Sequence, residues 1–102
     1  MIRDPEDCHS MAELRVEIDR IDGDLVMLLA RRARCIDRAV ALKRAEGLPA
    51  HIEARVVEVI ANARAAAAAE GLDPDLAAAL WERIVAWSIA REERALGAAS
   101  PS

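Results

Sequence analysis

An arginine occupies a position of the chain where a hydrophobic residue is expected. Hydrophobic residues recur at intervals of three and four along a predicted helix seam, at Leu14, Ile18, Ile21, Leu25 and Leu28. The next position of this seam is Arg32, and hydrophobic residues resume at Cys35, Ala39 and Leu42. Because burying an unpaired cation is costly, Arg32 requires an acidic partner or a bound anion.

Lys43 lies on the same face of this predicted helix as Arg32. Eleven residues separate the two, which places Lys43 about 20° around the helix from Arg32 at about 100° per residue. Helical side chains lean toward the N-terminus, so the Lys43 side chain points back toward Arg32. The two cations can therefore hold a small dianion, and ordinary salt bridges at the edge of the seam are the alternative.

Two further arginines are candidates for binding an anion. Arg15 lies about 25 Å along the helix from Arg32, too far to serve the same pocket within one chain. If two copies of the long helix pack antiparallel, the partner's Arg15 approaches the other end of a site built on Arg32 and Lys43. Arg55 falls in the first turn of the next expected helix, where backbone N–H groups favour anions; its alternative is a solvated surface position. Six further charged residues of the long helix are expected to form a solvated face: Arg31, Arg34, Asp37, Arg38, Arg44 and Glu46.

Ser88 and Glu92 supply a hydroxyl and a carboxyl to one face of a third expected helix. They are four residues apart and continue the line of Trp81 and Val85, so both side chains are expected to turn inward. No candidate histidine base lies near Ser88 on this helix, and a nucleophilic triad is therefore not expected.

The first of three predicted helices is unusually long. Ser10 and Glu13 form a capping-box pattern, which predicts a helix over residues 11–46 with Gly47 just after its end. Such a helix is about 54 Å long, whereas a compact chain of this size has a radius of gyration of about 13 Å. We therefore expect an intertwined homodimer in which two long helices pack along each other. The alternative is a three-helix monomer whose first helix breaks near Gly23.

Two shorter helices are predicted in the rest of the chain. The second is expected over residues 52–70 and stops at Gly71. Asp73 and Pro74 supply an N-cap and a first helical residue for the third helix, which Gly97 ends. The fold class is accordingly all-α, with a helical domain over residues 10–97 between a flexible N-terminus (1–9) and a flexible tail (98–102).

Composition excludes several classes of protein. The chain has 102 residues, 14 Lys and Arg against 18 Asp and Glu, and 54% hydrophobic residues, which argues against a disordered chain and against a nucleic-acid partner. It contains no signal-peptide core and no apolar run long enough for a membrane span, so we expect a cytoplasmic protein. Cys8 and Cys35 suggest neither disulfides nor zinc, and His9 and His51 lack ligand spacing, so no metal is expected.

Polar and hydrophobic positions combine into motifs that extend over nearly the whole chain. They are LRVEIDRIDGDLVMLLARR at residues 14–32, Lys43, GLP at 47–49, Arg55, GLDP at 71–74 and WSIARE at 87–92. This pattern, over residues 10–96, resembles the all-helical chorismate mutases. The opening PEDC at residues 5–8, with IDRID and IVAWSIA, is also similar to the isochorismate pyruvate lyase branch of the same fold.

The resemblance implies an entwined all-helical dimer with two equivalent pockets. In such enzymes the matching positions place Arg32, Lys43 and Arg55 of one chain around a dicarboxylate, together with the partner's Arg15. The arginine guanidinium group binds carboxylates through two parallel hydrogen bonds, so this arrangement fits a small dianionic substrate.

The resemblance also implies roles in the reaction. Lys43 and Glu92 would flank the ether oxygen that separates in the transition state, and Ser88 would lie near the ring or a carboxylate. The chain departs from the family where acids common near Arg55 are replaced by Ile52 and Val56, which puts contacts to a ring hydroxyl in doubt. Glu92 stands where several relatives have glutamine.

The rearrangement of chorismate to prephenate needs no nucleophile, metal or cofactor. The enzyme has only to hold the substrate in a reactive conformation and to stabilise the charge that develops on the ether oxygen. The first interpretation is therefore a chorismate mutase without a cofactor. The alternatives are an isochorismate pyruvate lyase, which would leave salicylate and pyruvate, a mutase of amino-substituted chorismate, and a catalytically silent helical dimer that acts as an interaction module.

Overall fold

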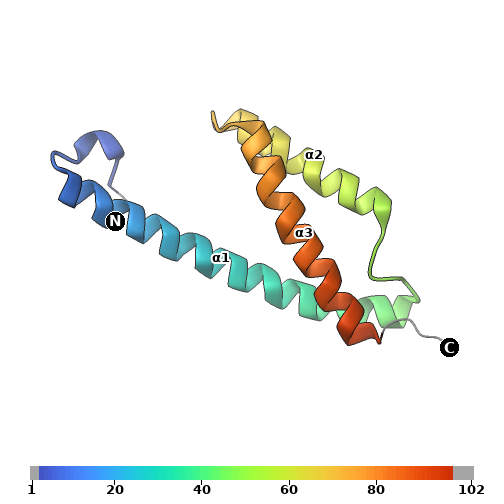
Figure 1. The fold of residues 1–102 in the computed structure, drawn as a ribbon. Coiled ribbons are helices and arrows are strands. Elements are labelled where there is room, and N and C mark those ends of the chain that lie inside the picture. Colours follow the sequence, from blue (N-terminus) through green and yellow to red (C-terminus); the bar gives the residue numbers. More distant parts are fainter. Residues whose placement is uncertain (1–2, 98–102) are drawn as a thin grey trace. The chain divides into compact units, whose positions relative to one another are not determined.

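The protein is built from helices joined by short connections. A computed structural model describes residues 3–97, in which a 3-10 helix, η1 (Pro5–Asp7), precedes α1 (Met11–Glu46), α2 (Glu53–Ala69) and α3 (Pro74–Leu96) (Figure 1). The described residues contain no strand, which confirms the predicted all-α class. Within the same range, no helix combines the length and the apolar composition that a membrane span requires. Residues 98–102, where a tail was predicted, lie outside the described residues.

The predicted start of the first helix is confirmed together with its cap. The Glu13 backbone N–H donates to Ser10 Oγ at 3.1 Å. The Glu13 carboxylate in turn accepts from the His9 backbone N–H at 3.0 Å, one residue before the position that a capping box specifies. The contact with Ser10 Oγ satisfies a backbone donor that the first turn would otherwise leave unpaired.

The second and third helices also begin and end near the predicted residues. The second is one residue shorter at each end than predicted. At the start of α3, the Asp73 carboxylate accepts from the Asp75 backbone N–H at 2.9 Å, with Pro74 as the first helical residue. Gly97 ends α3 in the left-handed region, with φ of 81°, a conformation that glycine adopts without steric cost.

Contacts divide the chain into two compact units, Met1–Arg34 and Cys35–Ser102, and α1 contributes to both. In the first unit the Arg3 backbone N–H donates to Glu17 Oε1 at 3.0 Å, and Arg3 Nη1 lies 3.3 Å from Glu13 Oε1. Glu17 is the one buried side chain among residues 3–34. Most large hydrophobic residues of this part of α1 are exposed: Met11, Val16, Ile18, Ile21, Leu25, Val26, Met27, Leu28 and Leu29.

The second unit has a small core where α2 and α3 meet. Ala63 and Ala67 of α2 are buried, as are Ala77 and Ala78 of α3. Figure 1 shows these helices close together at the turn that joins them and separating toward their other ends. Small side chains allow the two backbones to approach closely near the turn, and larger residues such as Val85 are buried further along α3.

Within this unit, the C-terminal part of α1 is joined to the last turns of α3 by polar contacts. Arg91 Nε and Nη2 donate to the two Asp37 carboxylate oxygens at 2.6 and 3.0 Å. Arg44 Nη2 donates to the Ala95 carbonyl oxygen at 2.9 Å. Asp37 and Arg44 are exposed as expected. Both side chains also connect two helices, which the sequence did not indicate.

The Asp37–Arg91 pair is expected to make stability depend on pH. The hydrogen bond from Arg91 lowers the pKa of the Asp37 carboxyl below its ordinary value of 3.8. A carboxyl with a lowered pKa in the folded state stabilises the fold above its unfolded-state pKa, and this contribution disappears as the pH falls through the folded-state pKa. We expect Asp37→Asn to lower the urea midpoint slightly at neutral pH, because the pair is exposed. The difference should vanish in acid, and an equal difference at both pH values would contradict this assignment.

Candidate functional site

The centre of the candidate site is an ion pair between α1 and α3 of the second unit. Lys43 Nζ donates to Glu92 Oε1 at 2.6 Å. The two side chains are 19% and 5% exposed, respectively. A carboxylate this deeply buried requires a cation or several donors to offset the loss of water, and Lys43 provides the cation. The structure therefore brings together two of the residues that the sequence singled out.

A second contact fixes the direction of the Lys43 ammonium group. Nζ also donates to the Ala50 carbonyl oxygen at 2.8 Å, in the connection between α1 and α2. An ammonium group carries three N–H donors. Among residues 3–97, these two oxygens account for two of the donors of Lys43, which leaves one for an acceptor outside the described residues. Sequence reasoning missed Ala50, because a backbone carbonyl carries no signal in the residue type.

Ser88 lies one helical turn before Glu92 and is buried as predicted. Its hydroxyl donates to the Ile84 carbonyl oxygen of the preceding turn at 2.8 Å. Ser88 and Glu92 therefore form a polar strip on the inner face of α3, in which the hydroxyl is oriented by its own helix and the carboxylate by Lys43. This strip can present oxygen atoms, and one held ammonium group, to a polar ligand.

Arg55 is found in the first turn of α2, as predicted, with an exposed side chain. Arg55 Nη1 lies 2.6 Å from Glu58 Oε1, an exposed ion pair within one helix. Ile52 and Val56, on either side of Arg55 in the sequence, are both half-buried. Arg55 is thus an accessible cation whose neighbours in the sequence include hydrophobic residues.

Arg15 and Arg32 belong to the first unit, on α1. The Arg15 side chain is exposed, and Arg32 is half-buried. The position of these two arginines relative to the Lys43–Glu92 pair stays a prediction.

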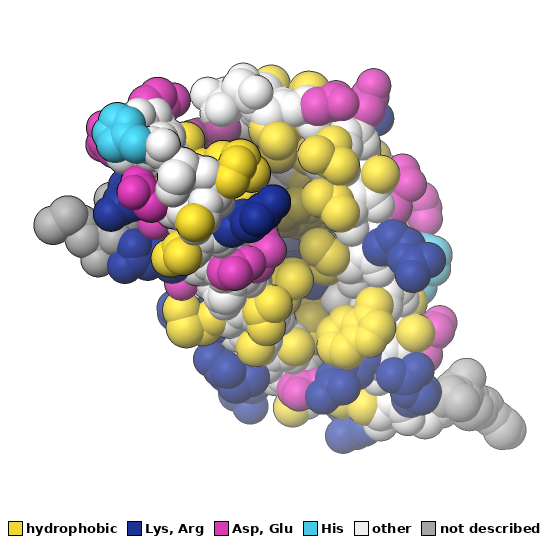
Figure 2. Space-filling model, turned by 60° about the vertical axis from the view of Figure 1, so that its left-hand side comes forward, with side chains coloured by type: hydrophobic (Ala, Val, Ile, Leu, Met, Phe, Trp, Pro, Cys, Tyr) yellow, Lys and Arg dark blue, Asp and Glu magenta, His cyan; other side chains and the backbone are white. Residues whose placement is uncertain are grey.

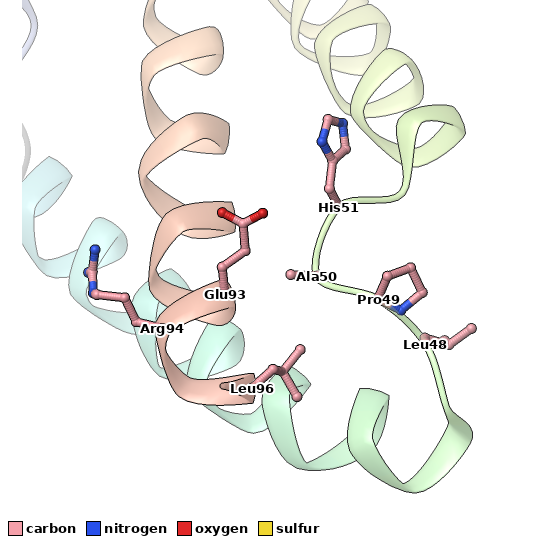
Figure 3. Close-up of a pocket in the computed structure, with 7 residues that line it drawn as sticks. All are labelled: Leu48, Pro49, Ala50, His51, Glu93, Arg94 and Leu96. Atoms are coloured by element: carbon pink, nitrogen blue, oxygen red, sulfur yellow. The ribbon is translucent and has the colours of Figure 1, made fainter. Parts of the chain in front are cut away.

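The second unit includes pockets that are lined by described residues. One, of about 660 Å³, is formed by the α1–α2 connection and the end of α3, and is lined by Leu48, Pro49, Ala50, His51, Glu93, Arg94 and Leu96 (Figure 3). The other, of about 500 Å³, lies between α2 and α3, with Val56, Val85 and Ile89 in its lining. The described residues that line these two pockets include neither Lys43 nor Glu92, so neither pocket is formed by the ion pair.

The described residues provide no evident metal site. Among residues 3–97, no three histidine, cysteine, aspartate or glutamate side chains are grouped as metal ligands. His51 Nε2 lies 3.0 Å from Glu53 Oε1, and Cys8 and Cys35 are free thiols. We assign no metal or cofactor role to these residues.

Comparison with known proteins gives a match over most of the chain. A family model described as chorismate mutase type II matches residues 14–93. An isochorismate pyruvate lyase of Pseudomonas aeruginosa is 35% identical over 92 residues, which are 89% of this chain and 89% of the relative. The T-proteins of Haemophilus influenzae and Enterobacter agglomerans are 28% and 32% identical over 85 and 82 residues. These matches cover 83% and 80% of this chain but only 22% of each T-protein.

Proposed function

Because the chain belongs to the chorismate mutase type II family, we propose that it catalyses a pericyclic reaction of a chorismate-type dicarboxylate. The first candidate is the rearrangement of chorismate to prephenate. In this reaction the bond between the ring and the ether oxygen breaks while a carbon–carbon bond forms. Negative charge develops on the ether oxygen in the transition state. Catalysis therefore depends on a donor placed at that oxygen and on binding the substrate in a reactive conformation.

The observation that supports this proposal is the fixed orientation of the Lys43 ammonium group. Glu92 and the Ala50 carbonyl oxygen bind two of its protons and fix its direction. The third donor is assigned to the ether oxygen. An ammonium group oriented before the substrate arrives needs little reorganisation as the charge develops, and this is the arrangement that lowers a barrier most. Glu92 then acts by orienting Lys43 beside the breaking bond, with Ser88 near the ring or a carboxylate.

The two substrate carboxylates are assigned to arginines. Arg32 and Arg55 of one chain, with the partner's Arg15, would bind them through bidentate hydrogen bonds. The Arg55–Glu58 pair is exposed and is therefore weak enough to be exchanged for a substrate carboxylate. The proposed ligand is thus a small dicarboxylate, bound at a site that needs a second copy of the chain.

The hydrophobic surface of α1 supports a homodimer. Among residues 3–34 no hydrophobic side chain is buried, and large hydrophobic residues from Met11 to Leu29 are exposed. Figure 2 shows hydrophobic side chains exposed at the surface. An amphipathic helix gains most of its stability from covering such a face. A second copy of the long helix would provide the cover and bring the partner's Arg15 to the site.

The elimination of pyruvate from isochorismate is a second candidate function. It is favoured by the half-buried Ile52 and Val56, where acids that could accept a hydrogen bond from a ring hydroxyl are absent. The similarity to the lyase of Pseudomonas aeruginosa also favours it. The bond between the ring and the ether oxygen breaks in this reaction as well, while a ring hydrogen moves to the methylene carbon of the enolpyruvyl group, which leaves pyruvate and the aromatic ring of salicylate. Lys43 would therefore keep the same role.

Product analysis separates the candidates. Protein purified from a host without its own chorismate mutase is incubated with chorismate and, separately, with isochorismate. We expect prephenate from chorismate; salicylate and pyruvate from isochorismate alone would support the lyase instead. Formation of neither product above the uncatalysed rate would overturn both proposals and leave a non-catalytic helical dimer.

A further inference from the structure

Two surface contacts lie on either side of the Lys43–Glu92 pair and join the same two helices. Along α1 the contact residues are Asp37, Lys43 and Arg44, and along α3 they are Arg91, Glu92 and Ala95. The Arg44 contact binds a carbonyl oxygen of the last turn of α3, which lacks a partner within the helix. The Asp37–Arg91 contact is a two-bond ion pair between side chains.

The Arg91 guanidinium is held from two directions. Both Asp37 carboxylate oxygens accept hydrogen bonds from it, at 2.6 and 3.0 Å. Its central carbon also lies 5.3 Å from the centre of the Trp87 ring, which belongs to the preceding turn of α3. A planar guanidinium bound to a carboxylate and held over an aromatic ring has little freedom to rotate.

The position of Arg91 is coupled to that of Glu92 by the geometry of the helix. The two residues are adjacent, so their side chains leave the α3 axis about 100° apart. If Asp37 fixes Arg91 against α1, the rotation of α3 about its own axis is fixed as well. Glu92 is then directed at Lys43, which lies further along α1 than Asp37.

We propose that Asp37 and Arg91 are a positioning pair for the reaction, since their ion pair holds α3 in the rotation that presents Glu92 to the Lys43 ammonium group. The inference rests on the proposed function of Lys43 and Glu92. Neither Asp37 nor Arg91 is assigned a contact with the substrate. They act through Glu92, which in turn orients the Lys43 donor.

Because the pair is exposed, a positioning role can be distinguished from a role in the stability of the fold. The Arg91 and Asp37 side chains are 40% and 51% exposed, and ion pairs of this kind contribute little to the stability of a fold. A displacement of about 1 Å in a catalytic group, by contrast, can reduce a rate up to about a hundredfold. Loss of the pair should therefore affect kcat much more than the urea midpoint.

Arg91→Gln, Asp37→Arg and the charge swap Asp37→Arg/Arg91→Asp test the proposal. The swap preserves the combined length of the two side chains. We expect each single variant to lower kcat about tenfold with KM near the wild-type value, since the loss concerns the transition state. The swap should recover most of kcat. Arg64→Gln is the matched control. Arg64 Nη1 also forms an exposed ion pair, with Asp75 Oδ1 at 2.8 Å, at the opposite end of α3. The kcat of this variant should not change.

Hydrogen exchange of residues 88–96, measured by mass spectrometry, gives a second readout that needs no activity. We expect faster exchange in the single variants and recovery in the swap. Wild-type kcat and exchange in Arg91→Gln, or a swap that restores neither, would overturn the positioning role. If the wild-type protein converts neither chorismate nor isochorismate, the proposed function fails, and the exchange result alone decides whether the pair positions α3.

Discussion

Replacing Lys43 with methionine is expected to lower kcat/KM about a hundredfold to a thousandfold on whichever substrate the protein converts. The methionine side chain has a similar length and hydrophobic stem but no donor for the ether oxygen. Because the lost interaction forms in the transition state, most of the change should appear in kcat. Steady-state kinetics with chorismate and isochorismate measure it.

Loss of folding is the competing explanation for an inactive Lys43→Met variant. Glu92 is buried, and removing one partner of a buried ion pair costs about 3–5 kcal/mol in typical cases. The double variant Lys43→Met/Glu92→Gln removes the unpaired carboxylate and should regain part of that stability in urea unfolding. If its activity stays lost while Glu92→Gln alone retains activity, the ammonium group itself is required. Near-wild-type activity in the double variant would show that Lys43 is not the donor.

The helices of this chain are well determined by local signals in the sequence. Ser10 and Asp73 cap the helices that follow them, and Gly97 ends α3 with a positive φ. Each of these effects depends on residues within one turn of the helix end, so the sequence alone is sufficient to predict it. The predicted range 11–46 of the first helix is confirmed for the same reason.

Contacts between distant residues could be predicted only in part. The inward faces of Ser88 and Glu92 followed from helical spacing, but the direct bond between Glu92 and Lys43 joins residues 49 positions apart. Asp37 and Arg44 have the composition of an ordinary solvated face, and nothing in their own spacing indicates that they bind Arg91 and the Ala95 carbonyl oxygen. Such pairs depend on how helices pack, which periodicity along one helix does not specify.

Mixing two inactive variants is expected to restore activity if each site is shared between two chains. Arg15→Ala and Arg32→Ala should each lose at least about a hundredfold in kcat/KM, because a carboxylate loses a charge-assisted partner. In a mixed dimer of the two variants, one site lacks both arginines and the other retains both. The mixed dimer, isolated through two different tags after co-expression, should therefore have about half of the wild-type activity per dimer.

The opposite pairing supplies a matched control with the same number of arginines. A mixed dimer of the wild-type chain and the double variant Arg15→Ala/Arg32→Ala has one arginine missing from each site if the sites are shared, so it should be inactive. If each site is instead built within one chain, the wild-type chain keeps its site, and this dimer should have about half activity while the first mixed dimer has none. The two dimers thus give opposite results under the two arrangements. A protein that sediments as a monomer at low micromolar concentration would exclude the shared site altogether.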